Sequence, residues 1–103
     1  MSSAQAEDTP LATDLLAAAR AGDGAAFQTL VGPHLRALHV HAYRMLGSLD
    51  DADEALQDAL LSAWRALDTY QGQAPLIHWL YRITFRLLVV VIRYSQWMRG
   101  AWP

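Results

Sequence analysis

The chain has 103 residues, no cysteine, a net charge of −2 and a hydrophobic fraction of 53%. Such a length predicts one domain with a single core, and the lack of cysteine excludes a disulfide framework and a thiolate metal site. Residues 1–10 have neither a basic start nor an apolar core, which excludes a secretory signal. We expect a flexible polar tail there and, by default, a cytoplasmic protein.

Charge is distributed unevenly along the chain. All ten acidic residues lie at or before Asp68, together with four arginines, so this part carries a charge of −6. The remainder carries +4, from Arg82, Arg86, Arg93 and Arg99. The first part suits a basic partner surface and the second an anionic one such as phosphate. A solvated acidic face with a few stray arginines is the alternative.

Apolar residues recur with helical spacing through the first two thirds of the chain. The first predicted helix runs from Leu11 to Gly22, a residue suited to the left-handed conformation that follows a helix. Asp23 is placed to cap a second helix that continues to Gly47. Pro33 falls inside this second pattern and should kink or split the helix.

A third helix is predicted after Gly47, with Ser48 or Asp51 as its cap. Asp51 and Glu54 have the spacing of a capping box, and carboxylates in a first turn are favoured by the helix dipole. An alanine-rich stripe faces the core and would let neighbouring helices approach closely. Polar side chains occupy the outer side, at Asp50, Asp53, Glu54, Gln57, Asp58 and Arg65.

The periodicity is lost from Asp68 to Pro75, where glycine and proline indicate a loop. Pro75 is suited to be the first residue of a fourth helix. The inward positions predicted for this helix are Leu76, Trp79, Leu80, Ile83 and Leu87.

A second face of the fourth helix is rich in arginine. His78, Arg82, Arg86 and Arg93 follow one another at spacings of four, four and seven, with Tyr81 and Phe85 beside them. Arginines with interleaved aromatic rings can bind phosphate and stack on unpaired bases. This face is therefore a candidate platform for single-stranded or melted DNA.

Several short motifs occur in an order typical of one protein family. They are Ala26-Phe27 with Leu30, His41 to Ser48, Asp51 to Asp58, Ala63-Trp64-Arg65, and Trp79 to Ile83. Together, from about Asp14 to Ile83, they resemble region 2 of the extracytoplasmic-function sigma factors of bacterial RNA polymerase. The resemblance implies an all-α fold, a compact bundle of about four helices.

The resemblance also implies two binding surfaces. The third predicted helix would dock on the coiled-coil clamp of the β′ subunit of core RNA polymerase, through Asp53, Glu54, Gln57, Asp58, Leu61 and Arg65. The loop after it would capture a flipped base of the −10 non-template strand of promoter DNA. The DNA-binding residues would be Tyr70, Gln71, Gln73, His78, Trp79, Tyr81, Arg82, Arg86 and Arg93. An anti-sigma factor is a candidate further partner.

The end of the chain is apolar and rich in tryptophan. The uninterrupted apolar run from Leu87 to Ile92 has six residues, far fewer than the ~20 of a membrane span, so we reject a spanning helix. The alternatives are a helix end packed on its own bundle or a second copy, an interfacial or partner-binding segment, and a strand. We expect a region 2-like domain over 11–95 and a C-terminal tail over 96–103, without the helix-turn-helix domain that reads the −35 element.

Neither a metal site nor a catalytic site is expected. His39 and His41 are two residues apart and cannot share a helix face, and His34 adds no Cys or convergent carboxylate. Phosphate loops and nucleophile motifs are not found, so we expect a protein that is not an enzyme and has no cofactor or small-molecule substrate. Two functions remain: a promoter-recognition and melting module, and a helical interaction module such as a polymerase-binding decoy.

Overall fold

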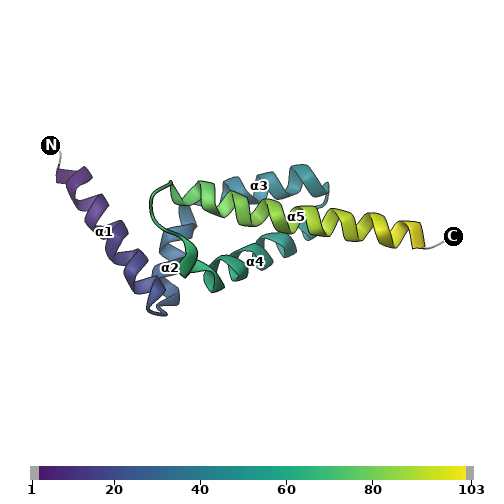
Figure 1. Ribbon diagram of the computed structural model, residues 1–103. Helices are drawn as coiled ribbons and strands as arrows, with labels where there is room; N and C mark the ends of the chain where they lie inside the picture. Colours follow the sequence, from purple (N-terminus) through teal and green to yellow (C-terminus); the bar gives the residue numbers. More distant parts are fainter. Residues whose placement is uncertain (1–2, 102–103) are drawn as a thin grey trace. The chain divides into compact units, whose positions relative to one another are not determined.

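The computed structural model describes the backbone of residues 3–101 and the side chains of residues 12–100. Every regular element in this range is helical, which confirms the all-α class. Contacts divide the chain into two units, one up to Leu35 and the other from Arg36. The elements, drawn in Figure 1, are α1 (Ser3–Arg20), α2 (Gly24–Val31), η1 (Gly32–His34), α3 (Leu35–Leu46), α4 (Leu49–Arg65), η2 (Leu67–Thr69) and α5 (Leu76–Ala101).

The first unit contains α1 and α2, which pack on each other. The α1 helix begins at Ser3, so it includes most of the segment expected as a tail, and residues 1 and 2 lie outside the described chain. The break between the helices is as predicted: Gly22 has a φ of 105°, a left-handed conformation that other residues rarely adopt. Asp23 Oδ1 then accepts hydrogen bonds from the backbone N–H groups of Ala25 and Ala26, at 3.0 and 3.3 Å.

Pro33 splits the second predicted helix into α2 and α3. The short 3₁₀-helix η1 lies between them, with the proline near its first position. Proline has no N–H to donate and its ring clashes with the preceding turn, so an uninterrupted α-helix is unfavourable here. This is one of the two outcomes predicted from the sequence.

The core of the second unit is built largely from alanine. Ala42 of α3, Ala52 and Ala55 of α4, and Leu88 of α5 form one buried cluster. Within this unit, α4 and α5 make the most extensive contact, and Ala59 and Ala63 continue the buried stripe of α4. Small side chains let helix axes approach closely, as the sequence predicted. The opposite side of α4 is thereby left to solvent.

The inward face of α5 differs from the predicted one. The fully buried positions are Leu80, Thr84 and Leu88, whereas Trp79, Ile83 and Leu87 lie half-buried at the edges. Thr84 can occupy the core because its hydroxyl donates to the Leu80 carbonyl at 2.8 Å, which satisfies the buried polar group. Leu80 was predicted to face inward and does, whereas the sequence placed Ile83 and Leu87 inward in place of Thr84 and Leu88, each one residue further along.

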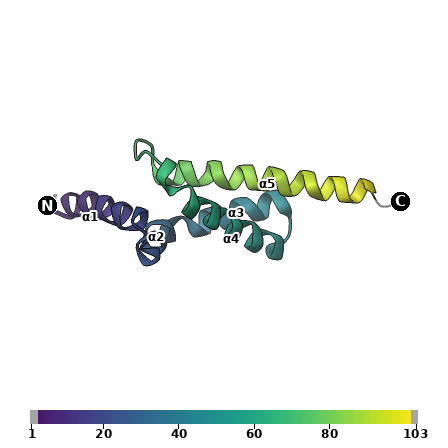
Figure 2. The same ribbon diagram turned by 60° about the horizontal axis from the view of Figure 1, so that its bottom comes forward.

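The α5 helix is also longer than predicted. It continues to Ala101 through the run where a strand was one alternative and through most of the expected tail. With 26 residues it is about 39 Å long, and its last turns extend past α3 and α4 in both ribbon views (Figures 1 and 2). Among the helices of residues 3–101, none has the length and apolar character needed to cross a membrane.

Candidate nucleic-acid interface

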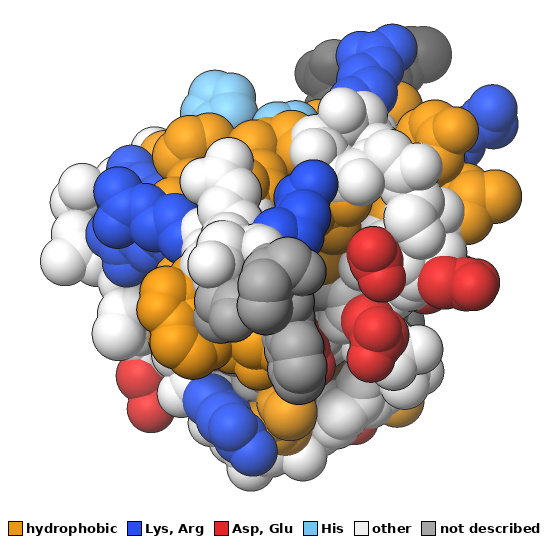
Figure 3. Space-filling view, turned by 90° about the vertical axis from the view of Figure 1, so that its right-hand side faces the viewer, with side chains coloured by type: hydrophobic (Ala, Val, Ile, Leu, Met, Phe, Trp, Pro, Cys, Tyr) orange, Lys and Arg blue, Asp and Glu red, His pale blue; other side chains and the backbone are white. Residues whose placement is uncertain are grey.

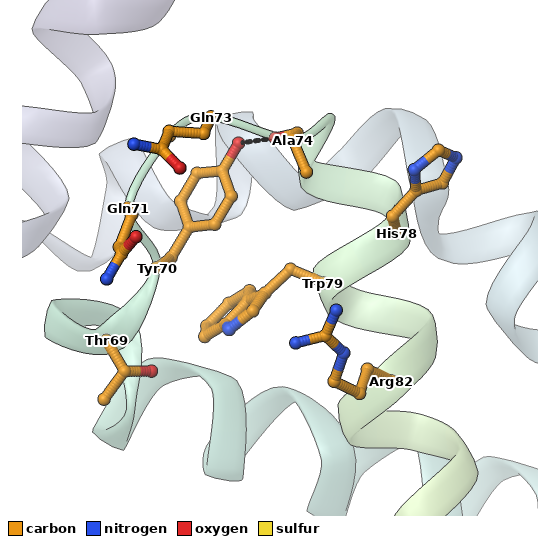
Figure 4. Close-up of a pocket in the computed structure, with 9 residues that line it drawn as sticks. Thr69, Tyr70, Gln71, Gln73, Ala74, His78, Trp79 and Arg82 are labelled. Atoms are coloured by element: carbon orange, nitrogen blue, oxygen red, sulfur yellow. Dashed lines mark hydrogen bonds between the residues drawn. The ribbon is translucent and has the colours of Figure 1, made fainter.

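A pocket of about 310 Å³ lies between the loop that precedes α5 and the first two turns of that helix. This volume is at the lower end of the roughly 300–1,000 Å³ typical of ligand sites. Six of the nine predicted DNA-binding residues line it, although they come from two different elements (Figure 4). The complete lining is Thr69, Tyr70, Gln71, Gly72, Gln73, Ala74, His78, Trp79 and Arg82.

The loop is held in shape by its own residues. The φ of 80° at Gly72 turns the chain back toward α5, a conformation that glycine adopts without strain. The Tyr70 hydroxyl donates a hydrogen bond to the Ala74 carbonyl and so bridges this turn (Figure 4). Before the turn, the Thr69 hydroxyl donates to the Ala66 carbonyl at 2.6 Å. The loop therefore presents a formed pocket wall.

Two aromatic rings form the centre of the pocket. The Tyr70 and Trp79 rings point toward each other, with centroids 5.3 Å apart and planes inclined by 39° (Figure 4). Both side chains are half-buried, so part of each ring remains open to solvent. Any of the four bases can stack on such ring faces once it is unstacked from the duplex, and each stacked base contributes roughly 1–3 kcal/mol to binding.

The polar groups around the rings suit a nucleotide. Gln71 and Gln73 are exposed and carry amides that both donate and accept hydrogen bonds, as the edge of a base requires. Arg82 supplies the one guanidinium, on the Trp79 side, whereas His78 points away from the two rings (Figure 4). None of the residues that line the pocket carries a carboxylate group. Its electrostatics therefore favour an anionic ligand.

A second candidate surface is the outer face of α4. Ser48 precedes the helix, and its hydroxyl accepts a hydrogen bond from the Asp51 N–H at 3.2 Å, so Ser48 rather than Asp51 is the cap. The buried alanines occupy one side and leave the predicted docking residues exposed on the other. Leu61 lies among them with 47% of its surface exposed. The exposed set is Asp53, Glu54, Gln57, Asp58, Leu61 and Arg65.

Asp53 differs from the other docking residues because it contacts α3. Its Oδ1 lies 2.7 Å from Nε2 of His39, with the two side chains 63% and 30% exposed. The contact lacks the directed N–H···O geometry of a hydrogen bond and is a close approach of the two side chains. Asp53 therefore lies at the edge of the α4 face, next to α3.

Comparison with known families shows which family this bundle belongs to. Residues 30–98 match the family described as Sigma-70 region 2, which is two thirds of the chain. The chain belongs to the sigma-70 region 2 family. Its resemblance to region 2 of extracytoplasmic-function sigma factors is likewise confirmed, since the relatives carry that description.

Three relatives show the extent of the similarity. The ECF RNA polymerase sigma factor SigM of Mycobacterium tuberculosis is 46% identical over 68% of this chain and 36% of its own length. SigG of the same species is 44% identical over 62% of the chain and 16% of its own length. The RNA polymerase sigma factor CnrH of Cupriavidus metallidurans is 40% identical over 80% and 43%. The chain thus spans less than half the length of each of these relatives.

Three predicted DNA-binding residues of this sigma region 2 lie outside the pocket. Tyr81 packs edge-to-face on His41 of α3, with centroids 5.3 Å apart and planes at 88°. It lies two residues from Trp79 and hence on the other side of α5. Arg86 borders a separate hollow of about 250 Å³, and Arg93 is exposed about two turns further along the helix.

The predicted set also omits three residues of the pocket wall. Thr69, Gly72 and Ala74 lie inside the loop predicted from 68 to 75, but none of them has a distinctive chemical group for DNA. The positive φ of Gly72 is the one feature that glycine in a loop could have suggested. Elsewhere in the described part of region 2, no group of three or more His, Cys, Asp or Glu is placed to hold a metal ion.

Proposed function

We propose that this region 2 opens and reads promoter DNA while bound to core RNA polymerase. In this proposal the outer face of α4 docks on the β′ clamp coiled coil, and the pocket before α5 holds a flipped base of the −10 non-template strand. Arg82, Arg86 and Arg93 contact backbone phosphates. No catalytic group is required of the chain, which acts in the cytoplasm where the polymerase works.

The pocket is the observation that carries the DNA half of the proposal. A base removed from the duplex loses stacking and pairing that cost a few kcal/mol, and a protein must replace them. Tyr70 and Trp79 offer ring faces, Gln71 and Gln73 offer hydrogen-bonding edges, and Arg82 offers a phosphate contact. Stacking, edge reading and charge are therefore available within one pocket.

The charge distribution supports the polymerase half. The α4 face carries Glu54 and Asp58 around the exposed Leu61, a combination of carboxylates and apolar surface that fits a basic helical partner. The pocket, in contrast, has one guanidinium and no carboxylate. The two surfaces are thus suited to partners of opposite charge.

The DNA half can be tested with forked DNA and core polymerase. The single-stranded −10 segment is randomised, and the strands bound by the complex are sequenced. Wild type should select bases at one position at least, and a Gln71→Ala/Gln73→Ala variant should relax that preference because the amides read the base edge. If both proteins select the same strands with equal strength, the pocket does not read a base.

Phosphate contacts are tested separately through salt. Arg82→Ala should weaken binding to all forks about equally and lower the slope of log K against log salt by about one, as the loss of one phosphate contact requires. Arg99→Ala removes the same charge from the far end of α5 and is the matched control. Equal slopes for Arg82→Ala and wild type would contradict the phosphate role.

Docking is tested with an isolated β′ clamp fragment. Gln57→Ala/Asp58→Lys should abolish most of the binding, whereas Asp14→Lys, an equal charge change on exposed α1, should leave it intact. Equal binding by wild type and both variants would show that the outer face of α4 does not dock on the clamp. Clamp binding without any binding of forked DNA would instead favour the decoy function.

A further inference from the structure

The distal half of α5 carries large apolar side chains that its own unit leaves uncovered. Val90, Tyr94 and Trp97 have 61%, 61% and 66% of their surfaces exposed. Their spacings of four and three place them on one helix face, which we call the distal stripe. The Tyr94 and Trp97 rings lie together, with centroids 6.2 Å apart and planes inclined by 32°. Isolated apolar residues on a surface are ordinary, but a continuous row marks an interaction site.

The distal stripe continues a row of apolar residues, here called the seam, that begins nearer the start of α5. From Ile83 through Leu87 to Val90, Tyr94 and Trp97 the spacings are four, three, four and three. This repeat averages 3.5 residues, the period of the a and d positions that form the contact between helices of a coiled coil. Ile83 and Leu87 are half-buried and line a hollow of about 250 Å³ with Ser62 of α4 and Ala66, the residue that follows this helix. The seam therefore runs from the hollow beside α4 to an exposed face of α5.

The charges beside the seam indicate the character of its partner. With Ile83, Val90 and Trp97 as d positions, Arg86 and Arg93 both fall at g, the position whose side chains pair with charges of a facing helix. Both arginines are exposed. The space-filling view toward the C-terminal end of α5 shows apolar side chains lying among arginines, with a group of carboxylates to one side (Figure 3).

A second copy of α5 does not satisfy these positions. The sequence contains no carboxylate after Asp68. An antiparallel pair of α5 helices would bring g-position arginines together, which is repulsive, and a parallel pair would set them opposite the e positions Val91 and Met98. A partner helix with glutamate or aspartate at e and g would instead neutralise Arg86 and Arg93.

We propose that the distal stripe is the docking site for an acidic amphipathic helix of a partner protein, which packs along α5 from Ile83 to Trp97. The partner's apolar side chains would enter the hollow at Ile83 and Leu87 and cover Val90, Tyr94 and Trp97. Its carboxylates would pair with Arg86 and Arg93. This surface is separate from the outer face of α4, so both can be occupied at once. It shares Arg86 and Arg93 with the proposed phosphate contacts, however, so the partner helix and promoter DNA would compete for these two arginines.

The probe for this site is a synthetic helix of three heptads with leucine at a and d and glutamate at e and g. A covalent staple on its outer face keeps it helical, since free helices of this length are marginal in water. A second peptide is identical except for lysine at e and g. Binding of each fluorescent peptide to the full chain is followed by anisotropy at two salt concentrations.

We expect the glutamate peptide to bind at least tenfold more tightly than the lysine peptide, with a preference that falls as salt rises. Trp97→Ala and Val90→Ser should each weaken its binding about tenfold, because central aromatic and apolar contacts carry most interface energy. Gln96→Ala, on the polar side of the same turn, is the matched control and should change nothing. All three side chains are exposed, so the thermal unfolding of the variants should match that of wild type.

Four results obtained with the peptides and the free chain would overturn the proposal. These are the absence of binding, equal binding of the two peptides, equal loss in Gln96→Ala and Trp97→Ala, and self-association of the chain that Trp97→Ala abolishes. Vesicles provide the remaining comparison. If phosphatidylglycerol vesicles bind the chain through Trp97 and compete with the glutamate peptide, the stripe is a membrane-surface segment and the helix proposal is wrong.

Discussion

The Tyr70 and Trp79 rings lie with their centroids 5.3 Å apart, which links the loop before α5 to the first turn of that helix. The Tyr70 hydroxyl makes a second link, to the Ala74 carbonyl within the loop. One side chain thus joins the loop to itself through a hydrogen bond and to α5 through a ring contact. The shape of the proposed base pocket depends on both.

Substitution of Tyr70 should separate these two contributions. Tyr70→Phe keeps the ring contact and loses one hydrogen bond, so the free energy of unfolding should fall by about 0.5–1.5 kcal/mol. Tyr70→Ala also loses the ring pair, which adds about 0.5–1.5 kcal/mol, and it should weaken fork binding much more than Tyr70→Phe does. Urea denaturation and fork anisotropy measure the two effects. Equal fork affinity of the two variants would show that the ring does not hold a base.

Gly72 tests whether the turn of the loop determines the pocket. Its φ is 80°, and a Cβ atom added there would meet nothing within 4 Å, so substitution acts only through the backbone. Gly72→Ala should cost roughly 1–2 kcal/mol of left-handed strain, and Gly72→Asn less, because asparagine tolerates this conformation. Thermal unfolding gives the cost. Gly24→Ala, at the first position of α2 without a positive φ, is the control and should be neutral or slightly stabilising.

The breaks and caps of the fold could be predicted from the sequence because they depend on neighbouring residues. The conformation of Gly22, the cap at Asp23 and the split at Pro33 each follow from the local chemistry of one residue. The face of α5 could not be predicted as well. In the run from Leu87 to Ile92 every residue is apolar, so no contrast marks the buried side.

The pocket shows the same limit. The sequence singles out the loop, aromatic and amide residues that line the pocket, but it does not separate Tyr81 from them, because Tyr81 lies beside arginines and belongs to the same family motif as Trp79. Its contact with His41 depends on where α3 packs, which the spacing along α5 cannot report. Long-range packing therefore decided which of two neighbouring aromatics, Trp79 or Tyr81, faces the pocket.

The small side chains of the alanine core allow its helices to pack closely, and larger or smaller side chains there should therefore lower stability. Ala52 is fully buried in the cluster with Ala42, Ala55 and Leu88, so Ala52→Leu should push the helices apart and cost about 1–3 kcal/mol. Leu88→Ala leaves a cavity at the same place and should cost about 2–5 kcal/mol. Urea denaturation measures both. Because the residues share one cluster, the double variant should be less unstable than the sum of the two.

The cap of α4 can be tested at Ser48. Ser48→Ala leaves the Asp51 N–H without its side-chain acceptor and should lower the free energy of unfolding by about 0.5–2 kcal/mol. Ser48→Gly should cost only a few tenths of a kcal/mol, because glycine is itself acceptable at this position. Circular dichroism melting distinguishes them. If alanine and glycine are equally tolerated, the helix does not depend on this hydrogen bond.

Asp53 contacts His39 of α3 and also lies on the proposed docking face of α4. Substitution of either residue can therefore affect both the stability of the α3–α4 contact and the binding of the clamp. Both side chains are partly exposed, so a double-mutant cycle with His39→Ala and Asp53→Ala should give a coupling of at most ~1 kcal/mol, which added salt reduces. In clamp binding the two substitutions should differ. Asp53→Ala removes a carboxylate from the docking face and should weaken binding, whereas His39→Ala frees that carboxylate and should leave binding equal or stronger. Equal weakening by both variants would mean that the pair, rather than Asp53 alone, forms the contact with the clamp.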